Sequence, residues 1–286
     1  MKLAKAKLPM WRCPLCHSSI SLEMSPIKCE NNHSFDKAKS GYVNLLPVQF
    51  KKSKVPGDDK AMVNARREFH RVNAYKPLKD KIASLIAEQL VNPEISTHNY
   101  RIYDAGCGEG SYLHEILLNL HAIGICCSGA GSDISKAAVE LAAKAYKSEQ
   151  FVVASSFDMP LSDNSQDIII QVFAPGNDNE YARVLKPGGL LVTVDPSFDH
   201  LYELKQAVYD NPHKHSPDTK KKQALSLVTS ERLTFPITFE SAEQCLALVK
   251  MTPFYWKLPE DKLNDIIKSL SRVTADFHIN LWKNAV

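Results

Sequence analysis

Four residues near the start of the chain have the types and the spacing of metal ligands. Cys13 and Cys16 are separated by two residues, Cys29 comes after twelve more, and His33 follows with three residues between. Zinc binds four tetrahedral thiolate or imidazole ligands, and each close pair on a short turn aims both donors at one point. Because the set lacks a carboxylate, we expect a closed structural zinc site. A redox Cys-x-x-Cys pair would instead open a helix in a thioredoxin-like unit, which the surrounding sequence does not predict.

The segment that holds these ligands is short. A module of about 35 residues is too small to be stable without its metal. Cys3His modules occur in nucleic-acid binders and in protein binders, so the metal alone does not identify the partner.

A glycine-rich segment, Asp104 to Gly110, has the composition of a nucleotide-binding loop. Glycines allow a sharp turn and a close approach of the backbone to a ligand. The spacing Gly-x-Gly-x-Gly differs from the dinucleotide pattern Gly-x-Gly-x-x-Gly, in which pyrophosphate lies on a helix N-terminus. Glu109 would repel pyrophosphate but tolerates a sulfonium and an ammonium. The charge therefore favours S-adenosylmethionine over NAD.

Two later segments extend this interpretation. An acid after the second strand, about 20 residues beyond the glycines, would bind ribose hydroxyls. Asp133 has this position, and Ser155 follows the third predicted strand, where an adenine would lie. The predicted donor site is formed by the ends of three successive strands and contains Asp104, Gly106, Gly108, Glu109, Gly110, Asp133 and Ser155.

Predicted strands and helices alternate from residue 100 onward, which implies βαβ units and a parallel, doubly wound sheet. Three consecutive isoleucines in the fourth strand indicate burial on both faces. Gly124, Gly129 and Gly131 weaken the second strand, which we expect to be apolar. Strands are predicted at 101–105, up to 132–133, and at 151–154, 167–173, 190–194, 231–237 and 273–282. Helices are predicted at 61–72, 78–91, up to 120, and at 135–147, 197–209, 240–250 and 260–271.

The composition is that of an ordinary globular protein, with 44% apolar and 23% charged residues among 286. No apolar run approaches the roughly 18 residues of a membrane span, and the first twelve residues contain no signal-peptide core. We therefore expect a cytoplasmic protein without a membrane partner. Three clustered cysteines among seven favour metal binding over a disulfide framework.

Residues 51–81 form a basic block. They include ten Lys or Arg and four acidic residues, in a chain whose formal net charge is +3. A basic block on a slightly acidic body fits a polyanionic partner, although a charge run is also typical of a solvated helix face. The candidates for phosphate contacts are Lys51, Lys52, Lys54, Arg66 and Arg67.

Several segments together resemble one known family. The loop 104–110, Asp133 and the turn 185–189 are similar to motifs of S-adenosylmethionine-dependent methyltransferases. Residues 13–16, 41–49, 56–58, 65–67, 251–254 and 276–279 narrow the resemblance to the RlmA/RrmA family of 23S rRNA guanine-N1 methyltransferases. The resemblance extends from about Cys13 to Trp282.

This resemblance implies an organisation and a function. It implies an RNA-recognising zinc module over 1–45, a basic linker with helices over 46–99, and a Rossmann-like class I methyltransferase domain over 100–286. The fold class is α/β with a mostly parallel, seven-stranded sheet. The resemblance also implies zinc on the four ligands above, and a homodimer whose cleft holds a 23S rRNA hairpin. Donor contacts are implied for Tyr75, Gly108, Glu109 and His200.

Transfer to guanine N1 needs a proton acceptor, because N1 is protonated at neutral pH. Asp195, at the end of the fifth strand, and His200 are the candidates. The other requirement is orientation, since the sulfonium leaving group needs no protonation. Residues 172–176 lack the Asn/Asp-Pro-Pro-aromatic sequence of exocyclic-amine methylases. Phe173 there could stack on a base or belong to the core.

Two other functions stay open on the residues alone. A small-molecule methyltransferase of the same fold would use the same glycine loop, but such enzymes seldom carry a zinc module and a basic block. A non-catalytic RNA-binding protein would also keep the fold, although the intact Glu109 and Asp133 speak against a dead donor site.

Overall fold

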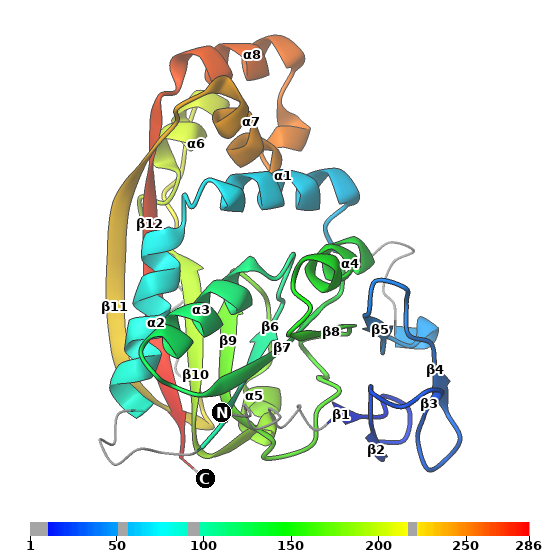
Figure 1. Ribbon diagram of the computed structural model, residues 1–286. Coiled ribbons are helices and arrows are strands. Elements are labelled where there is room, and N and C mark those ends of the chain that lie inside the picture. The colour runs from blue at the N-terminus through cyan, green and yellow to red at the C-terminus, as the bar shows by residue number, and fades with distance from the viewer. Residues whose placement is uncertain (1–10, 51–56, 91–97, 217–221, 286) are drawn as a thin grey trace.

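An eight-stranded sheet runs through the centre of the molecule (Figure 1). The computed structural model describes residues 11–50, 57–90, 98–216 and 222–285. From one edge to the other, the strands are β11 (Leu225–Thr238), β12 (Arg272–Asn284), β10 (Leu185–Pro196), β9 (Gln166–Val172), β6 (Tyr100–Ala105), β7 (Cys127–Asp133), β8 (Gln150–Val153) and β5 (Val43–Asn44).

The sheet is mostly parallel, as the alternating sequence pattern predicted. All pairs from β10 to β5 are parallel, whereas β12 pairs antiparallel with both β10 and β11. The sheet has one strand more than the seven predicted, because Val43–Asn44 adds to the free edge of β8. The late strands β11 and β12 are longer than predicted and pair along almost their whole lengths.

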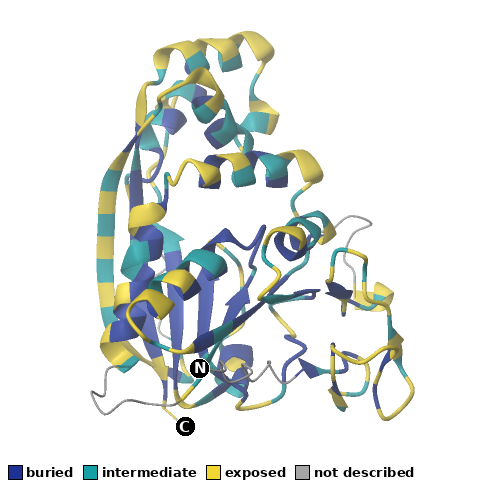
Figure 2. Cartoon of the chain, in the orientation of Figure 1, coloured by how far each residue is buried: buried dark blue, intermediate teal, exposed yellow. Residues whose placement is uncertain are grey.

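Three helices cover one face of the sheet: α2 (Lys76–Leu90), α3 (Ser111–Ala122) and α4 (Lys136–Ala145). The other face packs against α5 (Asp178–Val184), which the sequence analysis did not predict, and against the N-terminal segment. The fourth strand contacts both layers, since Ile168 and Ile170 belong to the first core and Ile169 to the second. The expected burial on both faces is confirmed, and the central strands are dark blue in Figure 2.

The two glycines of β7 are required by packing. A Cβ on Gly129 would lie 2.4 Å from Leu117 Cδ1 of α3, and one on Gly131 would lie 2.8 Å from Cys107 Cβ. The strand therefore forms in spite of its low apolar content, because α3 and the loop before it approach too closely for any side chain.

A cap of helices lies over the carboxyl ends of the strands (Figure 1). It consists of α1 (Lys60–Arg71), α6 (Tyr202–Val208), α7 (Ala242–Lys250) and α8 (Glu260–Ser269). The predicted helix 197–209 begins only at Tyr202, because Leu201 has a left-handed backbone with φ of 52°. Short 3₁₀-helices lie at Val48–Phe50 and Tyr255–Lys257. Within the described ranges, we find no helix with the length and apolarity that crossing a membrane requires.

The N-terminal segment consists of two small hairpins. β1 (Trp11–Arg12) pairs with β2 (Ser19–Ile20), and β3 (Ile27–Lys28) pairs with β4 (Ser34–Phe35). Trp11 attaches the first hairpin to the sheet: its side chain is buried, and its indole N–H donates to Gln150 Oε1 at 2.7 Å. The hairpins therefore share one apolar core with the face of the sheet that packs against α5.

Candidate active site and metal centre

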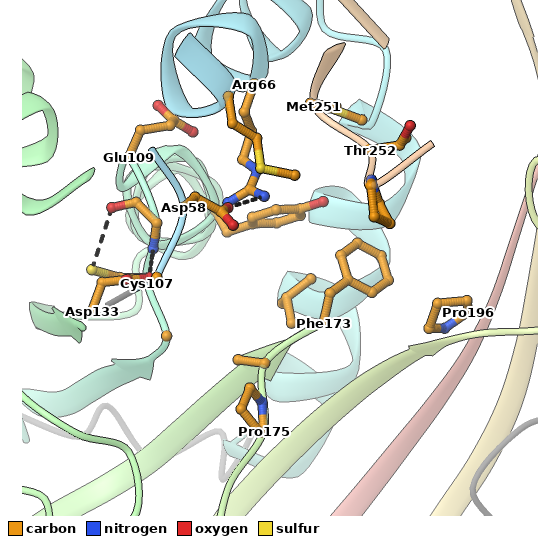
Figure 3. A pocket seen from close by; sticks show the side chains of 18 of the residues that line it. Asp58, Arg66, Cys107, Glu109, Asp133, Phe173, Pro175, Pro196, Met251 and Thr252 are labelled. Atoms are coloured by element: carbon orange, nitrogen blue, oxygen red, sulfur yellow. Dashed lines mark hydrogen bonds and ion pairs between the residues drawn. The ribbon is translucent and has the colours of Figure 1, made fainter. Parts of the chain in front are cut away.

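A cavity of about 930 Å³ lies between the cap and the carboxyl ends of the strands (Figure 3). Four strand ends contribute to its wall: residues 106–109 after β6, 132–134 after β7, 154–157 after β8, and 172–175 at the end of β9. The convergence of the first three strand ends was predicted from the sequence and is confirmed. The helix α1 and residues 251–254 contribute the opposite wall.

The glycine loop turns sharply after β6. Gly106 has φ of 93°, a left-handed value that glycine adopts without strain, and a Cβ there would lie 2.3 Å from Ala174 Cβ. The backbone N–H groups of Gly106 and Cys107 both donate to the Ser132 carbonyl at 2.8 Å. These bonds attach the loop to the end of β7, and Gly110 then leads into α3.

Asp133 binds the same loop through its side chain. Its Oδ2 accepts from the Gly108 N–H at 2.9 Å, and its Oδ1 accepts from the Ser135 N–H at 2.7 Å. Burial raises the pKa of Asp133, although both hydrogen bonds act in the opposite direction. Each carboxylate oxygen keeps a second acceptor position, so the residue can also bind ribose hydroxyls.

Two more acids surround the loop. Glu109 is buried, and burial raises its pKa, while its Oε1 accepts from the Ser111 N–H at 3.3 Å. Asp104 lies beneath the loop, and neither of its buried carboxylate oxygens has a hydrogen-bond partner among the described residues. Burial raises the pKa of Asp104 well above its ordinary value.

The charge at this end of the cavity discriminates between ligands. Unpartnered buried carboxyl groups are costly, so a ligand that carries a positive charge would relieve the cost and a pyrophosphate would increase it. Glu109 and Asp133, which line the cavity, therefore fit a positively charged group and the ribose of S-adenosylmethionine, whereas Asp104 was predicted as a donor contact but lies beneath the loop and does not line the cavity. Ser155 also lines the cavity, as predicted.

The basic block suggested that Arg66 lies on an open surface and contacts RNA phosphates. In the structure, Arg66 instead lines this cavity. It forms an ion pair with Asp58 at 2.5 Å, and Figure 3 shows it reaching down from α1. Arg67, its neighbour, lies 3.6 Å from Glu68 and is one-third exposed. The predicted contacts Lys51, Lys52 and Lys54 lie outside the described residues.

Aromatic rings form the far end of the cavity. The ring centroid of Tyr75 lies 6.4 Å from that of Phe173 and also 6.4 Å from that of His200. Phe173 has φ of 55° and a side chain that is 39% exposed. A strained backbone that presents an open ring into a cavity is typical of a functional position. Figure 3 shows Phe173 below Met251, between Cys107 of the glycine loop and Pro196.

His200 is a neutral hydrogen-bond donor at this end. Burial lowers its pKa to about 3, and nearby His215 and Lys205 act in the same direction. Its Nδ1 accepts from the backbone N–H of Asp276 at 3.3 Å. The imidazole proton is therefore on Nε2, which can donate a hydrogen bond but cannot accept a proton. This geometry argues against His200 as the general base.

The far end is otherwise basic. Lys205, His213 and His215 line it, and burial lowers the pKa of Lys205. Among the lining residues that the structure describes, the carboxylates are those of Asp58, Glu109 and Asp133, all next to the glycine loop. Lys205 was not predicted from the sequence, because no local motif gives a signal for it. Residues 251–254 were noted only through the family resemblance.

Asp195 does not line this cavity. It lines a second one of about 630 Å³, on the other side of residues 174–175. The two candidates for proton transfer are therefore in different cavities. Strand alternation explains the separation, because Asp195 and its neighbour Val194 point to opposite faces of β10.

The four predicted metal ligands come together in the N-terminal segment. All four donor atoms of Cys13, Cys16, Cys29 and His33 lie within 4.8 Å of one another. Cys16 Sγ lies 3.7 Å from Cys29 Sγ, and His33 Nδ1 lies 3.4 Å from Cys29 Sγ. Ligands on a tetrahedral zinc are about 3.5 to 3.8 Å apart, so the cluster has the right dimensions. A hydrogen bond from Ser18 lowers the pKa of Cys16 to about 5, which favours the thiolate that zinc binds.

Comparison with protein families gives two matches. A zinc-ribbon model described as "RlmA, N-terminal" matches residues 11–54, and one described as "Methyltransferase domain" matches residues 96–238. The first contains the cysteine and histidine cluster, and the second contains the glycine loop.

Curated proteins are similar over most of the chain. A putative 23S rRNA (guanine-N1-)-methyltransferase of Bacillus subtilis is 33% identical, covering 94% of this chain and 95% of its own length. The 23S rRNA (guanine(748)-N1)-methyltransferase of Streptomyces fradiae is 35% identical, covering 69% of this chain and 67% of its own length. A putative 23S rRNA (guanine-N1-)-methyltransferase of Micromonospora griseorubida is 34% identical, covering 69% of each.

Proposed function

The chain belongs to the family of 23S rRNA (guanine-N1) methyltransferases, and from that premise we propose that it methylates N1 of a guanine in a 23S rRNA hairpin. The methyl donor is S-adenosylmethionine. The observation that carries the proposal is the division of one cavity into an acidic end beside the glycine loop and an aromatic, basic end beside Phe173 and Lys205.

The acidic end binds the donor. Asp133 binds the ribose, and Glu109 compensates the positive charge of the methionine part, while Asp104 acts from beneath the loop. Ser155 lies next to the position of the adenine, and Tyr75 lies with Phe173 and His200 at the other end. When bound, S-adenosylmethionine supplies a methyl group on a sulfonium, a leaving group that needs no proton.

The basic end holds the guanine. The open ring of Phe173 stacks on the base, and the Nε2–H of His200 donates to an acceptor on its edge. Loss of the N1 proton leaves negative charge that is shared with O6 of guanine. The ammonium of Lys205, whose side chain is mostly buried, stabilises this charge. The proton passes to water, since the carboxylates of the described cavity wall lie at the other end.

The N-terminal cluster holds one zinc ion on Cys13, Cys16, Cys29 and His33. The ion has a structural role, because all four positions are filled by protein ligands. We propose that this zinc ribbon binds the RNA hairpin together with Arg67 and the lysines of the basic block, Lys51, Lys52 and Lys54. The ribbon is connected to the catalytic sheet through Trp11, so RNA bound there is held at a fixed position relative to the cavity.

Two finer features of the proposal rest on the family resemblance. The protein acts as a homodimer whose cleft holds the hairpin, and it works in the cytoplasm, where ribosomes assemble. Sedimentation velocity at micromolar concentration measures the first feature. A monomer both with and without RNA would contradict it.

Substrate binding at two salt concentrations tests the proposal against a small-molecule methyltransferase of the same fold. Affinity for an rRNA hairpin falls steeply with salt, since phosphate contacts release counterions. Calorimetry with the donor tests it against a non-catalytic RNA-binding protein. Absence of either binding reaction would overturn the proposed function.

A further inference from the structure

The second cavity lies directly beside the first. Its volume is about 630 Å³, and it shares Phe157, Ala174 and Pro175 with the wall of the active-site cavity. A ligand that fills the first cavity therefore has a neighbouring pocket within reach of its adjacent chemical groups. Nothing in the proposed reaction uses this pocket.

A row of polar side chains crosses three strands at the base of the second cavity. Gln171 of β9 is in register with Thr193 of β10, and Thr193 is in register with Asn280 of β12. Residues in register across neighbouring strands point to the same face of a sheet. The row therefore presents an amide, a hydroxyl and a second amide to one pocket.

Two members of the row already have protein partners. Tyr181 donates its hydroxyl proton to Gln171 Oε1 at 2.8 Å, and the Gln171 amide also donates to the Ala174 carbonyl. The indole N–H of Trp282 donates to Thr193 Oγ1 at 3.2 Å. These contacts fix the side chains that surround the third member.

Asn280 differs from its neighbours. Its side chain is 4% exposed, and no hydrogen bond reaches its carboxamide in the part of the chain that the structure describes. The carboxamide is open to the cavity that it lines, so its donor and acceptor positions are available to a ligand.

Charges around the pocket select the chemistry of that ligand. Asp195 contributes a carboxylate to the wall, and Lys222 is ion-paired with Asp178 at 2.5 Å. The carboxylate disfavours a phosphate. It favours a neutral group that offers N–H donors, and an aromatic plane can pack beside Trp282. A nucleobase with an exocyclic amino group has all of these properties.

We infer that the second cavity is a subsite for the nucleobase next to the target guanine, recognised by Asn280 and Asp195. The inference rests on the proposed function, since it requires an RNA substrate. It assigns the pocket a role in reading sequence: adenine, cytosine or guanine fits it, whereas uracil lacks the exocyclic amine. Direct base contacts of this kind change affinity by about tenfold or more.

The test combines one protein variant with one RNA change, using the full chain and the 23S rRNA hairpin that it binds most tightly. Asn280→Leu removes the hydrogen-bonding groups at similar volume. Each nucleotide next to the target guanine is replaced in turn by an abasic one. We expect Asn280→Leu to weaken hairpin binding about tenfold, and an abasic nucleotide at one flanking position to do the same to the wild type. Together the two changes should weaken binding no further than either alone.

Ser230→Ala is the matched control, because Ser230 of β11 pairs with Asn280 of β12 but does not line the cavity. It should leave hairpin affinity unchanged. Thermal unfolding shows whether Asn280→Leu folds; removal of an unpartnered amide should not lower its Tm. If it did, Asn280→Ala, which removes the same carboxamide without adding an apolar side chain of similar size, would replace it in the same cycle.

The outcomes separate the two proposals. If Asn280→Leu binds as tightly as the wild type, or if the two losses multiply, the subsite is wrong. If the wild type binds the hairpin with the expected cycle but never methylates it, the proposed function fails and the base subsite stands. If no 23S rRNA hairpin binds to the wild type, both fail.

Discussion

The carboxylate of Asp133 accepts a hydrogen bond from the backbone N–H of Gly108 at 2.9 Å. This bond joins the end of β7 to the glycine loop that follows β6. The residue assigned to the donor's ribose therefore also holds the loop in the shape that the donor requires. Its second oxygen accepts from the Ser135 N–H at the start of α4, so three segments converge on one side chain.

Replacement of Asp133 should weaken donor binding without unfolding the protein. Asp133→Asn keeps an acceptor for the loop but loses the negative charge, and a hydrogen bond to a charged group contributes about 1.5 to 3 kcal/mol. The expected rise in the donor Kd, measured by calorimetry, is about 10- to 100-fold. Asp261→Asn, on the exposed side of α8, is the control and should bind as the wild type does. Equal affinities in both variants would exclude Asp133 from the donor site.

Loss of zinc should separate the two binding activities. Cys16→Ser removes one of four ligands and should release the metal, as measured by elemental analysis of the purified protein. We expect RNA binding to be lost and donor binding to be retained, because the glycine loop and Asp133 lie on other elements. Cys126→Ser changes an exposed thiol outside the cluster and should keep the zinc. RNA binding that survives loss of the metal would contradict the role given to the ribbon.

Lys205 should affect the chemical step more than RNA affinity. Lys205→Met removes the charge that stabilises deprotonated guanine, and a group of this kind contributes about 100-fold or more to kcat. We expect kcat to fall, to be rescued in part by Lys205→Arg, and to recover in the methionine variant as pH rises. Lys262→Met is the control, since Lys262 donates to the Val208 carbonyl at 2.8 Å away from the cavity wall. A change in KM alone would show that Lys205 only binds the RNA.

His200 should make the protein less stable in mild acid. Its pKa is about 3 in the folded chain and about 6.5 in the unfolded one, so below pH 6.5 the unfolded state binds a proton that the folded state does not. Stability therefore falls as pH decreases, by about 1.4 kcal/mol per unit from this residue.

Urea unfolding at pH 6.5 and pH 4.5 measures this effect. His200→Gln should lose about 2 to 3 kcal/mol less than the wild type between the two values, because glutamine does not titrate. Identical losses in the two proteins would mean that His200 is protonated in the folded state and could serve as an acid.

The sequence predicted those parts of the site that lie on local motifs. The glycine loop, Asp133 and Ser155 each follow a strand directly, so the order of elements alone brings them to one edge of the sheet. The metal ligands could be predicted for the same reason, since each pair lies on one turn. Such positions depend on a few neighbouring residues and on a common topology.

Other positions depend on the packing of distant elements. Arg66 appeared as part of a basic block, but its direction depends on how α1 crosses above the strands, and it lies in the cavity beside Asp58. Asp195 and His200 are five residues apart, yet they line different cavities, because strand alternation and the loop after β10 separate them. Val43–Asn44 could not be predicted as an eighth strand, since two residues carry no periodic pattern.

The most direct measurement of the central claim is the position of the methyl group on the RNA. The full chain is incubated with labelled S-adenosylmethionine and with 23S rRNA from cells that lack the gene for this protein. The RNA is then digested, and the labelled nucleotide is identified. We expect one labelled guanine with the methyl group on N1, in a hairpin. Label on another base, on an exocyclic amine or on ribose, or an unlabelled RNA, would contradict it.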